Sequence, residues 1–141
     1  MANLQNIDSA IVSIEDVSVT VNIDGAFNGD LYAYLQHATG LAVLLNRVGR
    51  SSSNPFGFGD DGFQVTFNDS GGFPDIHTVA SGSGGAITGS YSANGRATDP
   101  DLVLDTDLRT VGLGAFLGAD ANGGWTLFVA DLSGGDSHTV E

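Results

Sequence analysis

The most regular feature of this chain is an alternation of apolar and polar residues over short runs. In residues 17–23 a valine or isoleucine occupies every second position, and the same period of two recurs in residues 31–36 and 63–67. Successive side chains of a strand point to opposite faces of the sheet. Each of these runs therefore predicts a β-strand with one buried face.

Residues 120–131 contain the only tryptophan of the chain. A turn rich in Asn and Gly leads into a run of strand-forming residues, in which Trp125 and every second residue after it share one face. Thr126, Phe128 and Ala130 share the other face. Because both faces carry apolar groups, we expect a strand that is covered on both sides, with Trp125 as the anchor of the core.

The remaining apolar runs are short and separated by turns. Residues 10–14, 41–45 and 86–91 are further strand candidates, residues 48–61 form a long loop rich in Gly, Ser and Asn, and residues 113–116 lead into the tryptophan strand. Short strands with frequent turns predict an all-β fold, an antiparallel β-sandwich of the jelly-roll type. We see no repeat and no linker, so residues 1–141 are predicted to form a single domain. We expect nine apolar residues to be buried together: Val19, Val21, Leu31, Leu35, Phe63, Phe67, Trp125, Leu127 and Val129.

Composition supports this interpretation and excludes several kinds of site. The chain has 141 residues, of which 41% are hydrophobic, and this suits one globular domain. Its 21 glycines indicate many turns and argue against a helical bundle. The chain has no cysteine, so it has no disulfide, no thiol nucleophile and no zinc–thiolate site.

The net charge of the chain limits the classes of molecule that it can bind. Seventeen acidic residues stand against four arginines and no lysine, which gives a net charge of −13. Nucleic acids and anionic membranes are therefore poor partners, whereas cations are good ones. No apolar run is long enough to cross a membrane, and the first residues show no signal-peptide pattern. A surface that is acidic only for solubility remains an alternative explanation.

Acidic and amide side chains gather in the turns that flank the expected strands. Carboxylate, amide and carbonyl oxygens are the ligands that Ca²⁺ takes in proteins, six to eight at a time. If the turns meet, their carboxylates repel one another unless a cation lies between them. We therefore expect a Ca²⁺ site drawn from Asp30, Asp60, Asp61, Asn68, Asp69, Asp120 and Asn122. The alternative is a set of acidic loops without metal. A second, weaker candidate set is Asp99, Asp101, Asp105 and Asp107.

The sequence assigns no catalytic residue. Residues 57–62 fit the pattern G-x-G-x-x-G, but two carboxylates lie inside the loop and a strand follows it, which does not suit a phosphate. His37, His77 and His138 coexist with many Ser and Asp residues, yet no G-x-S-x-G sequence marks a nucleophile. Paired carboxylates of the glycosidase type remain open. We expect no enzymatic activity.

A family resemblance rests on several motifs in order. Residues 122–131, Asn-Gly-Gly-Trp-Thr-Leu-Phe-Val-Ala-Asp, resemble the N-G-x-W-x-L-x-V-x-D strand of P domains, the β-sandwich modules of proprotein convertases. Other pieces are similar to the family's V-x-V-x-I and G-D-L motifs, its acidic G-D-x and F-x-D segment and its L-x-x-F-x-G motif; they lie at residues 17–23, 29–31, 60–63, 66–69 and 113–118. The resemblance covers roughly residues 10–138. It departs at Asp24, where the family often has His, and the chain ends where a final W-x-L strand is expected.

The resemblance implies a non-catalytic module. Such modules follow subtilisin-like catalytic domains, and bacterial exported proteins use them without a protease. Residues 98–107 and 131–136 look like the versions that precede a C-terminal sorting tail. The implied location is the bacterial cell surface or extracellular space, often with bound calcium, and the implied role is structural or adhesive.

Two further functions remain as alternatives to that role. One is a self-assembling subunit of a filament or surface layer, a homo-oligomer in which residues 1–8 or the C-terminal segment pair with a neighbouring chain by strand addition. The other is a carbohydrate-binding module. With the tryptophan assigned to the core, its sugar platform would have to come from Tyr32, Tyr34 and Tyr91.

Overall fold

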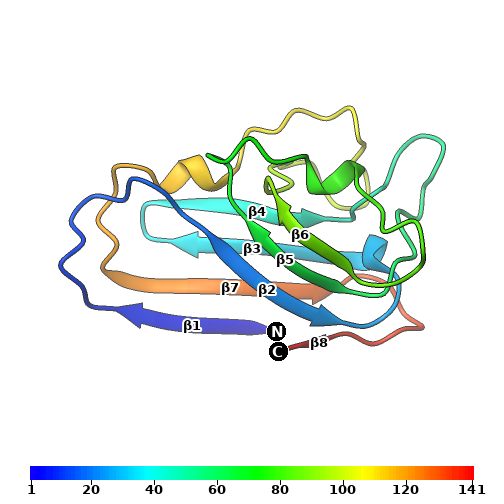
Figure 1. Ribbon diagram of the computed structural model, residues 1–141, viewed down its shortest axis with the longest axis horizontal. Coiled ribbons are helices and arrows are strands. Elements are labelled where there is room, and N and C mark those ends of the chain that lie inside the picture. Colours follow the sequence, from blue (N-terminus) through cyan, green and yellow to red (C-terminus); the bar gives the residue numbers. More distant parts are fainter.

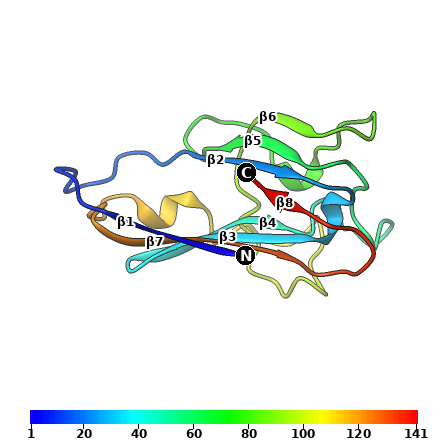
Figure 2. The same cartoon turned by 90° about the horizontal axis from the view of Figure 1, so that it is seen from below.

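The computed structural model describes all 141 residues as two four-stranded sheets packed face to face (Figure 1). The first sheet has the order β1 (Ala2–Ile7), β7 (Gly123–Asp131), β3 (Leu31–His37) and β4 (Gly40–Asn46). The second sheet has the order β6 (Ile87–Tyr91), β5 (Phe63–Phe67), β2 (Val19–Asp24) and β8 (Thr139–Val140). Figure 2 shows the two layers edge-on. The predicted all-β sandwich is confirmed.

Three short 3₁₀ helices lie between the strands: η1 (Asn28–Asp30), η2 (Ile76–Thr78) and η3 (Leu113–Phe116). Residues 113–116, which we expected to lead into the tryptophan strand, form η3. No helix of the chain is both long and apolar enough to span a bilayer.

The alternating runs produce the core as predicted. On β3 the odd-numbered residues from Leu31 are buried and the even-numbered tyrosines are only half-buried, which is the period of two read from the sequence. Six of the nine expected core residues are buried: Val21, Leu31, Leu35, Phe63, Phe67 and Val129. The other three, Val19, Trp125 and Leu127, pack against this core but remain half-buried. All three lie near the open edge formed by β1.

One strand pair departs from the expected antiparallel arrangement. β5 and β6 run parallel, with Phe63 beside Ile87 and Phe67 beside Tyr91. Parallel neighbours need a crossover that returns the chain to the start of the first strand. Residues 68–86, including η2, make that return.

Two segments differ from the sequence-based expectation for local reasons. Residues 10–14 do not form a strand. Instead, the Ile14 N–H donates to Ala119 O and the Gly118 N–H donates to Ile14 O, each at 2.8 Å, so the segment is held by a loop and not by a sheet. The N-terminal segment forms β1 and pairs with β7 of the same chain. Only residues 2–5 alternate between apolar and polar, and the sequence suggested a strand here only in the self-assembly alternative, as one that pairs with a neighbouring chain.

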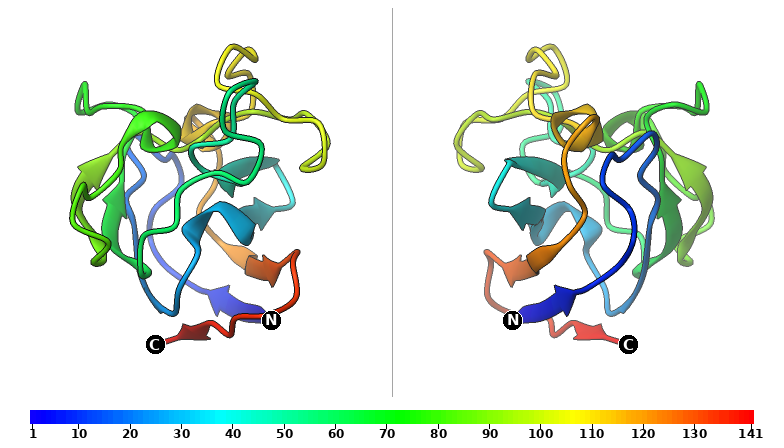
Figure 3. Two further views of the ribbon diagram at one scale, coloured as in Figure 1. Left: turned by 90° about the vertical axis from the view of Figure 1, so that its right-hand side faces the viewer. Right: turned by 90° about the vertical axis from the view of Figure 1, so that its left-hand side faces the viewer.

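Of the two outer edges of the first sheet, one is covered by a loop and the other is open. At β4 the backbone N–H groups of Asn94 and Gly95 donate to Leu44 O and Val43 O, so the loop that follows β6 covers that edge. β1 has no neighbour on its outer side, and every one of its residues is exposed. Both chain termini lie at this open edge (Figure 3).

Candidate functional site

The residues expected to bind calcium do not form one site. Asp60 and Asp61 precede β5, and Asn68 and Asp69 follow it. Seven residues of extended chain span about 23 Å, so these two pairs cannot share a cation. The expectation of a joint site is corrected, because the turns at the two ends of one strand cannot meet. In the whole chain, no group of three or more His, Asp or Glu side chains lies close enough to hold a metal ion.

Backbone N–H groups of neighbouring loops satisfy two of these carboxylates. Asp69 accepts from the N–H groups of Ala93 and Leu113, at 2.9 and 2.7 Å. Asp60 is buried and accepts from the N–H group (3.0 Å) and the hydroxyl of Ser81. These carboxylates therefore fasten loops to the sandwich.

The other expected ligands are also occupied by local contacts or exposed. Asp30 forms an ion pair with Arg47 (3.2 Å), and burial raises the pKa of this carboxyl above its ordinary value. Asp120 accepts from the backbone and side-chain N–H groups of Asn122. Asn122 in turn accepts from the Ser9 N–H at 2.5 Å. Asp61 is exposed, and the Asn68 amide bonds Asp16 and Ser18. In the second set, Asp99 accepts from the Asp101 N–H and Asp107 from the Leu104 N–H, and no cluster forms.

The three histidines lie in separate places. His37 stacks on Trp125 with 4.4 Å between ring centroids, and its ring nitrogens bond Thr39 Oγ1 and Asn122 O. His138 pairs with Asp131 at 3.1 Å. His77 is fully buried beneath the loop that covers β4. None of them bonds a serine hydroxyl.

The hydrogen bonds of His77 select its neutral form. Its Nε2 faces Arg50 O at 2.9 Å and must carry the hydrogen, because a carbonyl oxygen can only accept. Its Nδ1 accepts from the Asn94 amide at 2.8 Å. A second proton on Nδ1 would face a donor. Burial lowers the pKa of His77 below its ordinary value of 6.5.

Stability should therefore fall as the pH falls through the ordinary pKa of histidine. Below about pH 6.5 His77 is protonated in the unfolded chain but stays neutral in the folded chain. This difference in bound protons favours unfolding. We expect the free energy of unfolding, measured by urea titration, to decrease between about pH 7 and pH 5. The variant His77→Gln should be less stable at neutral pH but should lose most of this slope. An unchanged slope in that variant would assign the effect to another group.

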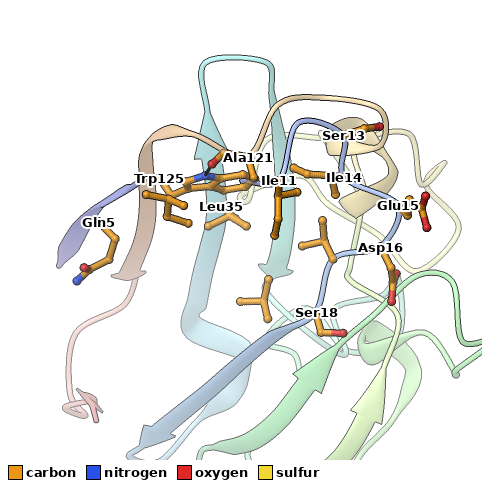
Figure 4. Close-up of a pocket in the computed structure, with 13 residues that line it drawn as sticks. Gln5, Ile11, Ser13, Ile14, Glu15, Asp16, Ser18, Leu35, Ala121 and Trp125 are labelled. Carbon is orange, nitrogen blue, oxygen red and sulfur yellow. Dashed lines mark hydrogen bonds between the residues drawn. The ribbon is translucent and has the colours of Figure 1, made fainter. Parts of the chain in front are cut away.

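The most prominent hollow of the molecule lies at the open edge, between β1, β7 and the segment leading into β2 (Figure 4). It has a volume of about 680 Å³. Figure 4 shows Trp125, Leu35, Ile11 and Ile14 gathered around its centre. The eight apolar residues that line it are Ile7, Ile11, Ile14, Val17, Val19, Leu35, Ala121 and Trp125. Ile11 is 54% exposed although it belongs to this apolar wall.

A smaller hollow of about 140 Å³ continues in the same direction along β7. It is lined by Leu127 and Val129, which follow Trp125 on the same face, and by Val140 of β8. We call the two hollows together the edge groove. From residue 1 to residue 7 the β1 strand that borders it spans about 20 Å, so the groove has the length of a strand of about six residues.

The groove stays open because β1 presents polar side chains toward it. In the strand register Asn3 lies opposite Leu127 and Gln5 opposite Trp125, and directly paired residues share a face. Asn3 and Gln5 bond each other at 3.0 Å. These polar groups do not bury the apolar side chains beside them. This corrects the expectation that Trp125 is enclosed: its indole N–H donates to Ala121 O at 2.8 Å, but its ring stays half-buried.

A free backbone edge borders the groove on the second sheet. β8 pairs only with Ile23 and Asp24 of β2, and the Glu141 N–H donates to Asn22 O at 3.0 Å. Alternate residues of a strand direct their N–H and C=O groups to the same side. Thr20 therefore directs its backbone groups toward the space beyond β8, next to the groove.

An aromatic cluster lies on the outer face of the first sheet. The rings of Tyr34 and Phe128 stack with 4.8 Å between centroids, and Tyr32 meets Tyr34 edge-on at 6.0 Å. Tyr91 lies on the other sheet, where its hydroxyl donates to Thr88 O. The three tyrosines considered as a sugar platform are therefore divided between two surfaces.

One feature of the sequence is related to the edge groove. Ile11 and Ile14 are apolar but follow no strand period, and the only role assigned to them was a short strand. The β1 residues that pair with Trp125 and Leu127 are Gln5 and Asn3, and both are polar. The groove therefore depends on the register between β1 and β7, which no local sequence pattern encodes.

Comparison of the chain with protein-family models, with curated proteins and with solved structures finds no match.

Proposed function

We propose that this protein is a non-catalytic binding module that takes an extended segment of a partner into the edge groove. The observation that carries the proposal is the groove itself: an apolar wall bordered by an unpaired strand edge on each sheet. A strand that adds to such an edge forms backbone hydrogen bonds, and its alternate side chains fill the apolar space.

The shape of the groove favours a strand over a small molecule. Small-molecule sites bury most of the ligand in a concave pocket with a few convergent polar groups. The edge groove is long and open along β7, and the side chains that β7 directs into it are the apolar Trp125, Leu127 and Val129. A segment of about six extended residues would match its length.

The resemblance to P domains supports the biological setting. On this proposal the chain is a module of a bacterial exported protein, with a structural or adhesive role outside the cell. Calcium stabilisation remains part of the proposal, with individual carboxylates and loop carbonyls as ligands. Binding is therefore measured both with calcium and with a chelator.

The single tryptophan provides a direct test. A blocked peptide of alternating valine and threonine, about six residues long, is titrated into the full chain while Trp125 emission is recorded. We expect a blue shift that saturates, because the peptide covers the half-buried indole. A constant emission at every peptide concentration would contradict the proposal.

A matched pair of variants locates the binding. Ile11→Ser removes an exposed apolar side chain from the groove wall, whereas Leu108→Ser removes one that is 81% exposed elsewhere. We expect Ile11→Ser to weaken peptide binding about tenfold, which corresponds to about 1.4 kcal/mol of lost apolar contact, and Leu108→Ser to leave it unchanged. Equal effects of the two variants would place the peptide outside the groove.

A second candidate function rests on the outer aromatic cluster. The stacked rings of Tyr34 and Phe128 offer apolar faces of the kind that sugars contact. Tyr34→Ala should abolish binding to a soluble polysaccharide in gel electrophoresis, and should leave the Trp125 peptide signal intact, if this surface is a sugar site.

A further inference from the structure

The charge around the edge groove limits which segment it can take. This inference rests on the proposed function. The wall of the larger hollow includes five polar residues; two of them, Glu15 and Asp16, are carboxylates, and none is a cation. Both are exposed, and Figure 4 places them together at one end of the apolar wall.

Asp16 is held in its ionised form. Its Oδ2 accepts from the Asn68 amide at 2.8 Å. Hydrogen bonds from Ser70 and Asn68 lower the pKa of Asp16 below its ordinary value. The negative end of the groove therefore persists through the neutral and mildly acidic range.

No arginine of the chain neutralises this end. Arg47 pairs with Asp30 and Asp101, and Arg96 pairs with Asp75. Arg50 donates to Pro100 O and Arg109 donates to Ala93 O. All four arginines thus bind the loops around η1, η2 and residues 93–109, and none of them lines the groove.

A second copy of this chain is a poor occupant of the groove. Each copy carries a net charge of −13, so two copies repel each other at ordinary ionic strength. The strand that a copy could donate, β1, presents Asn3 and Gln5 on one face and has no regular apolar alternation to fill the groove.

We propose that the occupant is an extended segment of a different protein, in which apolar residues alternate and lysine or arginine flanks them. The apolar residues cover Trp125 and its neighbours, and the basic residues lie against Glu15 and Asp16. Opposite charge at the rim raises the rate of association and selects among segments that are equally apolar.

Three peptides test this inference on the full chain. They share the alternating valine and threonine core and carry two lysines, two glutamates or two serines at the ends. By Trp125 emission we expect the lysine peptide to bind about three- to tenfold more tightly than the serine peptide at low salt, and the glutamate peptide to bind most weakly. The preference should disappear in about 1 M salt.

The double variant Glu15→Gln, Asp16→Asn is the matched control. It keeps the size of both side chains and should bind the lysine and serine peptides equally. If the lysine and serine peptides bind the native chain equally, or if the double variant keeps the preference, the charge inference is wrong and the binding function stands. If none of the peptides changes Trp125 emission, the proposed function fails as well. If the molar mass measured by light scattering rises with protein concentration, the occupant is a second copy of the chain, and the inference of a basic partner is wrong.

Discussion

Replacement of Leu45 by alanine is expected to lower the free energy of unfolding by about 3–5 kcal/mol, whereas Leu127→Ala lowers it by only about 1–2 kcal/mol. The two substitutions remove the same atoms from two strands of one sheet, β4 and β7. Leu45 is 0% exposed and belongs to the core, so its removal leaves a cavity among packed side chains. Leu127 is half-buried beside Asn3 and already borders solvent in the edge groove.

Urea titration of both variants measures the two losses in the free energy of unfolding. The slope m of each titration shows whether the unfolded state has changed. The comparison tests the groove independently of any ligand. Equal losses of about 3 kcal/mol or more would mean that β1 closes over Leu127 in solution, and the edge groove would then be filled by the chain itself.

Replacement of Asp75 by alanine is expected to cost about 3–5 kcal/mol, although Asp75 lies outside the apolar core. Its Oδ2 is 2.9 Å from Arg96 Nη2, and the Arg96 side chain is only 3% exposed. Arg109 approaches the same oxygen at 3.8 Å. Removing the carboxylate leaves a buried guanidinium without a counter-charge, and also removes the acceptor for the His77 N–H at the start of η2.

An exposed ion pair provides the matched control. Asp101 lies 3.5 Å from Arg47 but is 85% exposed, so Asp101→Ala should change the free energy of unfolding by less than about 0.5 kcal/mol. Both changes delete an aspartate that pairs with an arginine, one nearly buried and one exposed; the Asp75 change also removes the Arg109 contact and the acceptor of the His77 N–H. A small, equal effect of both substitutions would show that Arg96 reaches water when its partner is removed.

The strands were predictable where one face is buried. In residues 19–24, 31–37 and 63–67 the period of two follows directly from burying alternate side chains, so the sequence determined both the strands and the buried face. It also determined the all-β class, through short apolar runs separated by glycine-rich turns, and the absence of disulfides. No strand pattern predicted β1 within the sandwich, because an edge strand exposed on both faces needs no apolar alternation; residues 1–8 were considered only as a strand that adds to a neighbouring chain.

The expected metal site depended on a different kind of information. The sequence shows that Asp60 and Asn68 flank one strand, but proximity in sequence does not bring strand ends together: an extended strand holds them apart. Only the tertiary structure shows that Asp60 bonds Ser81 and that Asp69 bonds Ala93 and Leu113. These partners come from loops distant in the chain, and no local rule pairs them.

By itself the sequence determined which side chains are apolar and favour burial, and which turns are acidic. It also determined that the four basic side chains are arginines. The tertiary structure decided which apolar side chains reach the interior. Trp125 carries the strongest apolar signal in the chain, yet it stays half-buried because the register of β1 sets Gln5 beside it and Asn3 beside Leu127. Register is a relation between two strands more than a hundred residues apart. For that reason the edge groove, on which the proposed binding function rests, is visible only in the tertiary structure.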